Sequence, residues 1–116
     1  MLSFESETVG GLGMDSVVMT TTNGVAVLTL SGELDIAMAP RVRNRLEDFA
    51  GDVELDCSAL TFIDSAGINL FVELHHTRVD AGAKLTLVNP PHCVTRLLEL
   101  TEVDRLVDVR SEDTGT

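Results

Sequence analysis

The residues best suited to chemistry lie in a short polar stretch inside an apolar run. In TFIDSAGINLFVEL, residues 61–74, an acid and a hydroxyl, Asp64 and Ser65, precede two small residues, Ala66 and Gly67, before the apolar run resumes. A serine in this setting could act as a nucleophile, cap the start of a helix, or accept a phosphate. These three roles make different demands on the surrounding residues.

Nucleophilic catalysis is disfavoured by the surroundings of Ser65. A catalytic serine needs a base within hydrogen-bond reach, and the residues around Ser65 do not form a G-x-S-x-G motif. His75 lies on the same predicted helix, and at about 1.5 Å per residue it would be roughly 15 Å from Ser65. Nothing in the sequence places His92 closer. We therefore predict that the protein is not an enzyme.

The histidines and cysteines are not spaced as metal ligands. His75 and His76 are adjacent, so on a helix they project about 100° apart, whereas zinc-binding helices place histidines at i and i+4. His92 and Cys93 have the same weakness, and Cys57 and Cys93 form no CxxC pair. We interpret both cysteines as reduced thiols packed as small hydrophobic groups. The sequence predicts no metal and no cofactor.

Two roles remain open for the Asp64–Ser65 pair. Either side chain, placed before a helix, can accept a hydrogen bond from a backbone N–H of the first turn. A phosphate on Ser65 would also be stabilised by those N–H groups and by the helix dipole. Such a phosphate adds about −1.5 to −2 charges, and beside Asp64 it would change partner binding by repulsion. Local physics permits both roles.

The charge balance restricts the expected partners. The 116 residues include 8 Lys and Arg against 19 Asp and Glu, for a net charge of −11. This composition argues against binding DNA, RNA or an anionic membrane surface, because those partners favour Lys and Arg. A folded protein with cationic surface patches is the expected partner. There is no apolar run of about 18 residues and no secretory signal pattern, so we expect a cytoplasmic protein.

Strand and helix patterns alternate along most of the chain. Asn23-Gly24 lies between Val- and Thr-rich runs and is the strongest short signal for a β-hairpin. The expected strands lie near residues 17–22, 25–30, 53–57, 84–88 and 106–109. The expected helices run from Pro40 to Gly51, over residues 66–80, and after Pro91 through Val94, Leu97, Leu98 and Thr101.

The alternation from residue 53 onward is typical of parallel strands joined by helical crossovers. We predict an α/β fold: one domain with a small mixed sheet, an N-terminal hairpin and three to four helices mainly on one face. The domain is expected over residues 17–110, between a flexible, glycine-containing tail at 1–16 and a polar tail at 111–116. Met14 is an alternative start of the chain.

Three motifs in order resemble a known family. These are Ser31–Asp35 (SGELD) after the second strand, Asp64–Gly67 (DSAG) after the third, and the helix that begins at the prolines. The stretches VAVLTLSGELDIAMAPRVRNRL, LDCSALTFIDSAGINLFVEL and AKLTLVNPPHCVTRLLELTEVDRLVDV carry the likeness. Over residues 17–110 the chain resembles the STAS domain, and more closely the stand-alone bacterial anti-sigma-factor antagonists. The resemblance implies a single STAS-like domain.

The resemblance also implies a function and a modified residue. Antagonists of this family, when unphosphorylated, bind an anti-sigma factor that is also a serine kinase, and so release the sigma factor. The kinase then phosphorylates the serine after the motif's aspartate, the complex dissociates, and a phosphatase resets the antagonist. By position the phosphoacceptor is Ser65, Asp64 supports the loop or the phosphotransfer, and Ala66 leaves a single hydroxyl. The alternative is an accessory STAS subunit of a transporter or a stress-sensing complex.

Steps of about 100° per residue divide the predicted 66–80 helix into faces. One arc should face the sheet: Ile68, Phe71, Val72, His75 and Val79. The opposite arc is polar: Asn69, Glu73, His76 and Asp80. A third edge holds Leu70 and Leu74, which either pack on a neighbouring helix or form the apolar centre of a partner site.

We predict a partner surface around the DSAG motif. On the helix it would include Ser65, Asn69 and Glu73, which are one turn apart, together with Asp64 at the helix start. Glu33 and Asp35, in the expected loop after the second strand, would lie beside them. Acidic groups at the rim would speed association with a basic partner.

Overall fold

One six-stranded sheet forms the centre of the fold, with the strands in sequence order. The computed structural model describes residues 3–8 and 15–112, with side chains from residue 15 onward. The strands are β1 (Ser3–Thr8), β2 (Ser16–Thr22), β3 (Val25–Leu34), β4 (Asp52–Ile63), β5 (Leu85–Val88) and β6 (Asp108–Arg110). Strands β1 to β3 pair antiparallel and β3 to β6 pair parallel. The predicted mixed sheet is therefore confirmed.

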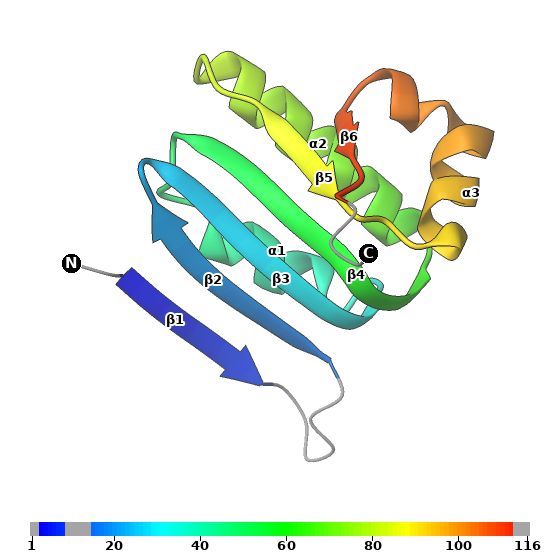
Figure 1. Ribbon diagram of the computed structural model, residues 1–116, viewed down its shortest axis with the longest axis horizontal. Helices are drawn as coiled ribbons and strands as arrows, with labels where there is room; N and C mark the ends of the chain where they lie inside the picture. The colour runs from blue at the N-terminus through cyan, green and yellow to red at the C-terminus, as the bar shows by residue number, and fades with distance from the viewer. Residues whose placement is uncertain (1–2, 9–14, 113–116) are drawn as a thin grey trace.

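Helices connect each pair of parallel strands. The helix α1 (Ala39–Arg45) joins β3 to β4, α2 (Ser65–Asp80) joins β4 to β5, and α3 (His92–Thr101) with the short 3-10 helix η1 (Val103–Arg105) joins β5 to β6. In Figure 1, α1 and α2 pack against each other behind the sheet, and α3 lies near β4. Parallel neighbouring strands need such crossovers, because the chain must return to the opposite end of the sheet before the next strand begins.

The core lies between the sheet and the helices behind it. Leu28, Leu55 and Leu87 are register partners on β3, β4 and β5, and all three are fully buried. From α2, Leu70 and Phe71 are fully buried as well. Each such side chain contributes about 1.5–3 kcal/mol by leaving water. This layer fixes where α2 begins relative to the strand ends.

The N-terminal part confirms one prediction and corrects another. Asn23 and Gly24 have φ angles of 54° and 79°, as a two-residue hairpin turn requires, so the predicted hairpin forms. Residues 3–8, however, were expected in a tail, and they form β1, paired with β2 from Ser3↔Thr21 to Thr8↔Ser16. An edge strand can form through backbone hydrogen bonds to its neighbour. It therefore does not need an apolar pattern, and residues 3–8 have none. The Gly10–Gly13 segment, Met14 and residues 113–116 lie outside the described residues.

Strands β3 and β4 are longer than predicted, and this places the candidate site. The expected loop at Ser31–Leu34 and the expected connection at 58–63 pair with each other as strand. Two register shifts accommodate the polar residues, one on each side of Ser31–Gly32, where Gly32 has a φ of 96°. Pairing between distant segments outweighs the local turn signal of serine and glycine.

The first helix is shorter than predicted, and Gly51 does not end it. The helix α1 ends at Arg45, although the predicted stripe still packs, with Val42 and Leu46 buried and Phe49 half-buried. A Cβ at Gly51 would lie 2.6 Å from the carbonyl oxygen of Gly24. Gly51 therefore allows the start of β4 to pass close to the hairpin turn.

Candidate functional site

The candidate site lies where β3 and β4 end and α2 begins. Leu34 and Ile63 are register partners at the carboxyl ends of these strands, and the N–H of Asp64 donates to the carbonyl oxygen of Leu34 at 3.4 Å. Figure 1 shows both strand ends and the start of α2 at one edge of the sheet. Parallel strands present their following loops at the same edge. The segments after Leu34 and after Ile63 therefore leave the sheet side by side.

Asp64 is the cap of α2. One carboxylate oxygen, Oδ1, accepts hydrogen bonds from the N–H groups of Ala66 at 2.9 Å and Gly67 at 3.4 Å. Ser65 is the first residue of the helix and is exposed. The sequence left open which of the two caps the helix, and the geometry assigns that role to Asp64. The Ser65 hydroxyl is therefore not the group that caps the helix.

Gly67 allows α2 to start close to the strands. A Cβ on this buried residue would lie 2.6 Å from Cγ1 of Ile63 and 2.9 Å from both Cγ and the carbonyl oxygen of Leu34. Real Cβ atoms do not approach other atoms so closely, so only glycine fits without a shift of the helix. The small residue in the motif thus serves the packing beneath Ser65.

Asp35 orders the turn between β3 and α1. Its Oδ1 accepts hydrogen bonds from the N–H groups of Ala37 at 3.0 Å and Met38 at 3.1 Å. Its carbonyl oxygen accepts from the N–H of Ala39 at 2.9 Å. This arrangement is an Asx turn that leads into the helix. Asp35 therefore holds the loop beside the start of α2 in one conformation.

Glu33 has a different setting from Asp35. It lies within β3 rather than in a loop, it is exposed, and its register partner on β4 is Phe62. Its N–H donates to Oδ1 of Asp15 at 3.2 Å, which anchors the strand where its register shifts. The Glu33 side chain is thus exposed to solvent, while the Asp35 carboxylate is engaged in the turn.

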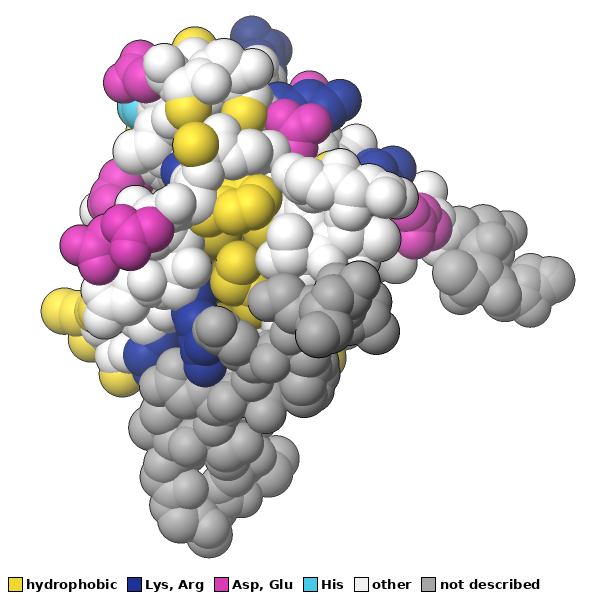
Figure 2. Space-filling model, turned by 90° about the vertical axis from the view of Figure 1, so that its left-hand side faces the viewer, with side chains coloured by type: hydrophobic (Ala, Val, Ile, Leu, Met, Phe, Trp, Pro, Cys, Tyr) yellow, Lys and Arg dark blue, Asp and Glu magenta, His cyan; other side chains and the backbone are white. Residues whose placement is uncertain are grey.

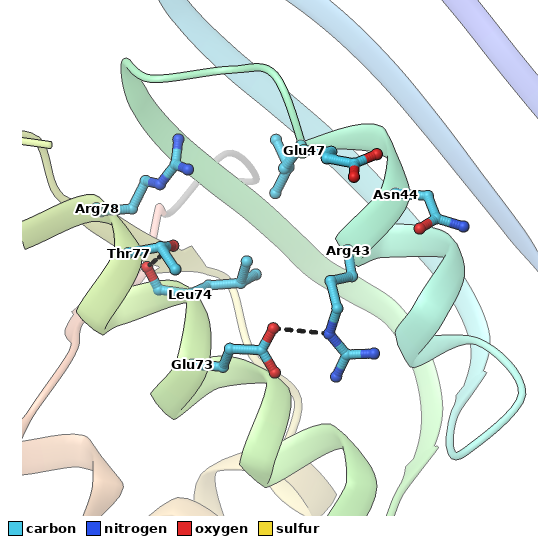
Figure 3. Close-up of a pocket in the computed structure, with 8 residues that line it drawn as sticks. Arg43, Asn44, Glu47, Glu73, Leu74, Thr77 and Arg78 are labelled. Atoms are coloured by element: carbon cyan, nitrogen blue, oxygen red, sulfur yellow. Dashed lines mark hydrogen bonds and ion pairs between the residues drawn. The ribbon is translucent and has the colours of Figure 1, made fainter. Parts of the chain in front are cut away.

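The outer face of α2 carries the predicted polar residues. Ser65, Asn69 and Glu73 are exposed and follow one another at helical spacing. Glu73, however, accepts a hydrogen bond from Nε of Arg43 at 2.7 Å. Figure 3 shows the two side chains pointing toward each other across the groove between α2 and α1, which has a volume of about 220 Å³. The negative charge of Glu73 is therefore offset by Arg43 within the chain. Half-exposed ion pairs of this kind contribute only about 0–1 kcal/mol to the stability of the fold.

The buried faces of α2 differ in part from the prediction. Leu70 and Leu74 are buried, so they belong to the core and do not form an exposed apolar centre. Ile68 and Phe71 are buried as expected, but Val79 is 54 % exposed. The position nearest the core in the last turn is instead Arg78, which is 6 % exposed.

Arg78 connects α2 to the segment before β4. Its Nη1 donates to the carbonyl oxygens of Phe49 at 2.6 Å and Gly51 at 3.1 Å. In Figure 3 its guanidinium points away from the Glu73–Arg43 pair. Burial lowers the pKa of this guanidinium below its usual value. Sequence reasoning missed this role, although Phe71, Leu74 and Arg78 follow the i, i+3, i+7 spacing of a buried stripe.

The remaining reactive side chains do not converge on this site. Burial, with a smaller effect of Asp56, raises the pKa of the Cys57 thiol to about 12, so this thiol packs as a hydrophobic group. Cys93 is exposed at the start of α3, which corrects the expectation that both thiols are packed. The rings of His75 and His76 contact each other edge to face, with their centroids 5.4 Å apart. Within the described residues no three His, Cys, Asp or Glu side chains are grouped as metal ligands.

Charges are mixed on the face that Figure 2 shows. Acidic side chains lie along its left side with basic ones below them, both kinds occur at the upper right, and a strip of hydrophobic side chains runs through the middle. The net charge of −11 is therefore not gathered in one patch on the part of this face that the structure describes. Among the described helices, none is long and apolar enough to cross a membrane.

The fold and the site define a small α/β domain that presents a serine at the capped start of a helix. The chain belongs to the STAS-domain family, whose model matches residues 16–114. The resemblance predicted from the three motifs is confirmed, and with it the STAS-like fold. The family match covers the whole sheet except β1.

Several relatives share this fold. The anti-sigma-B factor antagonist of Bacillus subtilis is 25% identical over 91 residues, which cover 76% of this chain and 84% of the relative. A candidate anti-sigma factor antagonist from Thermotoga maritima superposes with a TM-score of 0.72 at 23% identity, covering 94% of this chain and 86% of the other. Unphosphorylated SpoIIAA, an anti-sigma factor antagonist, gives a TM-score of 0.64 at 19% identity, covering 97% and 90%.

The same fold also occurs inside larger proteins. The murine anion transporter Slc26a9 matches 90% of this chain over 18% of its own length, with a TM-score of 0.62 at 19% identity. SpoIIAA is also known in a phosphorylated form, which matches with a TM-score of 0.66 at 17% identity and covers 97% of this chain and 93% of the other. At these identities the structural likeness shows the fold, and the function has to be argued from the site.

Proposed function

We propose that this protein is an anti-sigma-factor antagonist that phosphorylation of Ser65 switches off. In its unphosphorylated form it would bind an anti-sigma factor with serine kinase activity and so release the sigma factor. The observation that carries the proposal is the placement of Ser65, exposed as the first residue of α2 while Asp64 caps the helix. Its hydroxyl is thus presented to another protein by a rigid helix start. The names of the relatives support the same role.

The surroundings of Ser65 favour a switch that acts through charge. Asp64 already accepts from the N–H groups of Ala66 and Gly67, so these donors are not available to a phosphate on Ser65. The phosphate would stand at the surface beside a carboxylate and add about −1.5 to −2 charges there. The close packing of Gly67 on Leu34 holds the loop in place. The partner would therefore meet the same backbone with a new negative charge.

The other residues of the predicted surface divide into two roles. We propose that Glu33, Asn69 and Glu73, which are exposed, contact the partner together with Ser65. Asp64 and Asp35 would act mainly by shaping the two loops, because their carboxylates accept backbone hydrogen bonds. Glu73 would reach the partner as part of its ion pair with Arg43.

The proposal defines the rest of the cycle. A serine phosphatase would remove the phosphate, no cofactor would be bound by the antagonist itself, and neither nucleic acid nor membrane would be a partner. The protein would act in the cytoplasm, where sigma factors act. It would be a regulator and not an enzyme, because the chemistry at Ser65 would be performed on it by the kinase and the phosphatase.

An accessory subunit of a transporter or stress-sensing complex is the second candidate, because the same fold also forms part of the anion transporter Slc26a9. In that case Ser65 would be an exposed first-turn residue without a phosphate. Gene context separates the candidates, since a neighbouring gene for a histidine-kinase-like ATPase supports the antagonist and neighbouring transport genes support the subunit.

The direct test is phosphorylation by the purified anti-sigma-factor serine kinases of the same genome, with ATP and with mass-spectrometric mapping. We expect one phosphate on Ser65 and none on the Ser65→Ala variant, which should still bind the kinase. Ser65→Asp should bind more weakly than Ser65→Asn, the neutral control of similar size. Full labelling of Ser65→Ala at another residue would refute the proposal.

A further inference from the structure

Ile36 is an exposed apolar side chain on an ordered turn. Among the described large hydrophobic residues it has the highest exposure, at 79 %. It follows Asp35, whose carboxylate fixes the next residues by accepting from the N–H groups of Ala37 and Met38. Because the backbone of this turn is already ordered, a partner that buries Ile36 has little backbone freedom left to remove. An aliphatic side chain of this kind can anchor an interface when a pocket of the partner buries it completely.

Ile36 and Ser65 leave the sheet from the same pair of residues. Ile36 lies two residues after Leu34, Ser65 lies two residues after Ile63, and Leu34 and Ile63 are register partners. With about 3.6 Å per residue and about 4.8 Å between strands, the Cα atoms of Ile36 and Ser65 are at most roughly 20 Å apart. A standard interface of about 800 Å² per partner is roughly 30 Å across. One partner can therefore cover both residues.

We propose that Ile36 is the apolar anchor of the surface around Ser65 and inserts into an apolar pocket of the anti-sigma-factor kinase, bordered by basic side chains. This inference rests on the proposed function and adds the residue that supplies affinity. The basic border follows from charge complementarity, because the exposed carboxylate of Glu33 lies at the same edge in a chain of net charge −11. The sequence offered Leu70 and Leu74 as a possible apolar centre of the partner surface, but both are buried, and Ile36 was not among the predicted residues.

The burial of Ile36 also explains how a phosphate on Ser65 would weaken partner binding. Burial of Ile36 requires removal of water from this edge of the sheet. A phosphate on Ser65 carries about two negative charges and binds water strongly, so it opposes desolvation of the neighbouring surface. Affinity from Ile36 and control from Ser65 are thus separate properties of one site.

Leu100 provides a matched control for Ile36. It is also large, apolar and 72 % exposed, but it lies on α3. Because both side chains are mostly in water, their replacement by serine should leave the thermal unfolding midpoint close to that of the wild type. Any difference in binding between the two variants then reports the position of the interface.

The experiment measures binding of fluorescently labelled protein to the purified anti-sigma-factor serine kinases of the same genome, without ATP. Ile36→Ser should weaken binding by about tenfold to a hundredfold, as expected for losing one buried aliphatic side chain. Ile36→Val, which removes one methylene group, should weaken binding by only about fourfold, and Leu100→Ser should be unchanged. Equal affinities for Ile36→Ser and wild type, or an equal loss in Leu100→Ser, would overturn the anchor.

The Ser65→Ala variant separates this inference from the proposed function. If wild type and Ser65→Ala bind a kinase and Ile36→Ser binds it equally well, only the anchor fails. If the wild type binds none of these kinases, the proposed function fails and the anchor fails with it. Sedimentation of the protein alone is the second measurement. A dimer that Ile36→Ser dissociates would mean that a second copy covers Ile36, which also overturns the inference.

Discussion

Gly67→Ala sets two effects against each other at the base of the site. Gly67 lies within α2, where alanine is favoured over glycine by about 0.8–1 kcal/mol. Its Cβ would however lie 2.6 Å from Cγ1 of Ile63 and 2.9 Å from the carbonyl oxygen of Leu34. Overpacking of this kind costs typically about 1–3 kcal/mol. The backbone oxygen cannot rotate away as a side chain can, so we place the cost in the upper half of that range.

The net expectation is a loss of about 1–2 kcal/mol in the free energy of unfolding, because the overpacking outweighs the gain in helix propensity. For a domain of this size that corresponds to a lower unfolding midpoint by about 4–8 °C. Urea unfolding followed by circular dichroism measures the free energy, and a thermal scan measures the midpoint. The displaced helix start should also slow phosphorylation of Ser65, since Ser65 lies two residues before Gly67.

Asn69→Ala is the matched control for Gly67→Ala. Asn69 is exposed on the same helix, so this variant gains helix propensity without a clash and should be as stable as the wild type or slightly more stable. The two alanine variants should therefore shift the free energy of unfolding in opposite directions. A Gly67→Ala protein as stable as Asn69→Ala would refute the packing role assigned to Gly67.

Three further predictions follow from the hydrogen bonds and from burial. Asp64→Ala should lower the free energy of unfolding by about 1 kcal/mol in urea titrations, while Asp64→Asn, which can still cap the helix, should lose less. Arg78→Met should lower the free energy of unfolding by about 1–3 kcal/mol, because the methionine fills the space but leaves the carbonyl oxygens of Phe49 and Gly51 without this donor. A loss no larger than in an exposed-site variant such as Arg105→Met would contradict the role of Arg78. The pKa of Cys57 is raised from 9.0 to about 12, so its contribution to stability is complete below pH 9 and is lost as the pH rises toward 12. Unfolding at pH 8 and pH 10 should show this loss in the wild type and not in Cys57→Ala, and a thiol reagent should label Cys93 in the folded protein but Cys57 only after unfolding.

Much of the fold could be predicted because its signals are local. Asn23-Gly24 requires positive φ angles and so marks the hairpin wherever the chain folds. Apolar spacing marked α2 to within a residue at its start and gave its end correctly, because the helix period depends only on neighbouring residues. The segments that local patterns could not predict are β1 and the ends of β3 and β4, whose strand structure comes from pairing with distant residues.

For the candidate site, the sequence by itself determined which residues stand at the start of α2. The order of an apolar strand, Asp64-Ser65 and an amphipathic run places a polar pair at a helix start, and the motifs carry the family resemblance. The sequence also determined the net charge and hence the kind of partner expected. These properties depend on residue type and on spacings of a few residues.

Only the tertiary structure decided what each of these residues does. In the tertiary structure, Asp64 caps α2, and the carboxylate of Asp35 accepts backbone hydrogen bonds in the turn that follows it. Glu73 pairs with Arg43, and Arg78 is buried. The pairing of β3 with β4 brings Ile36 to the edge of the sheet that carries Ser65. The partners of Glu73 and Arg78 are about thirty positions away in the sequence. Contacts over such separations depend on how α1 and α2 pack on the sheet. The spacing of apolar residues within one helix or strand does not predict that packing.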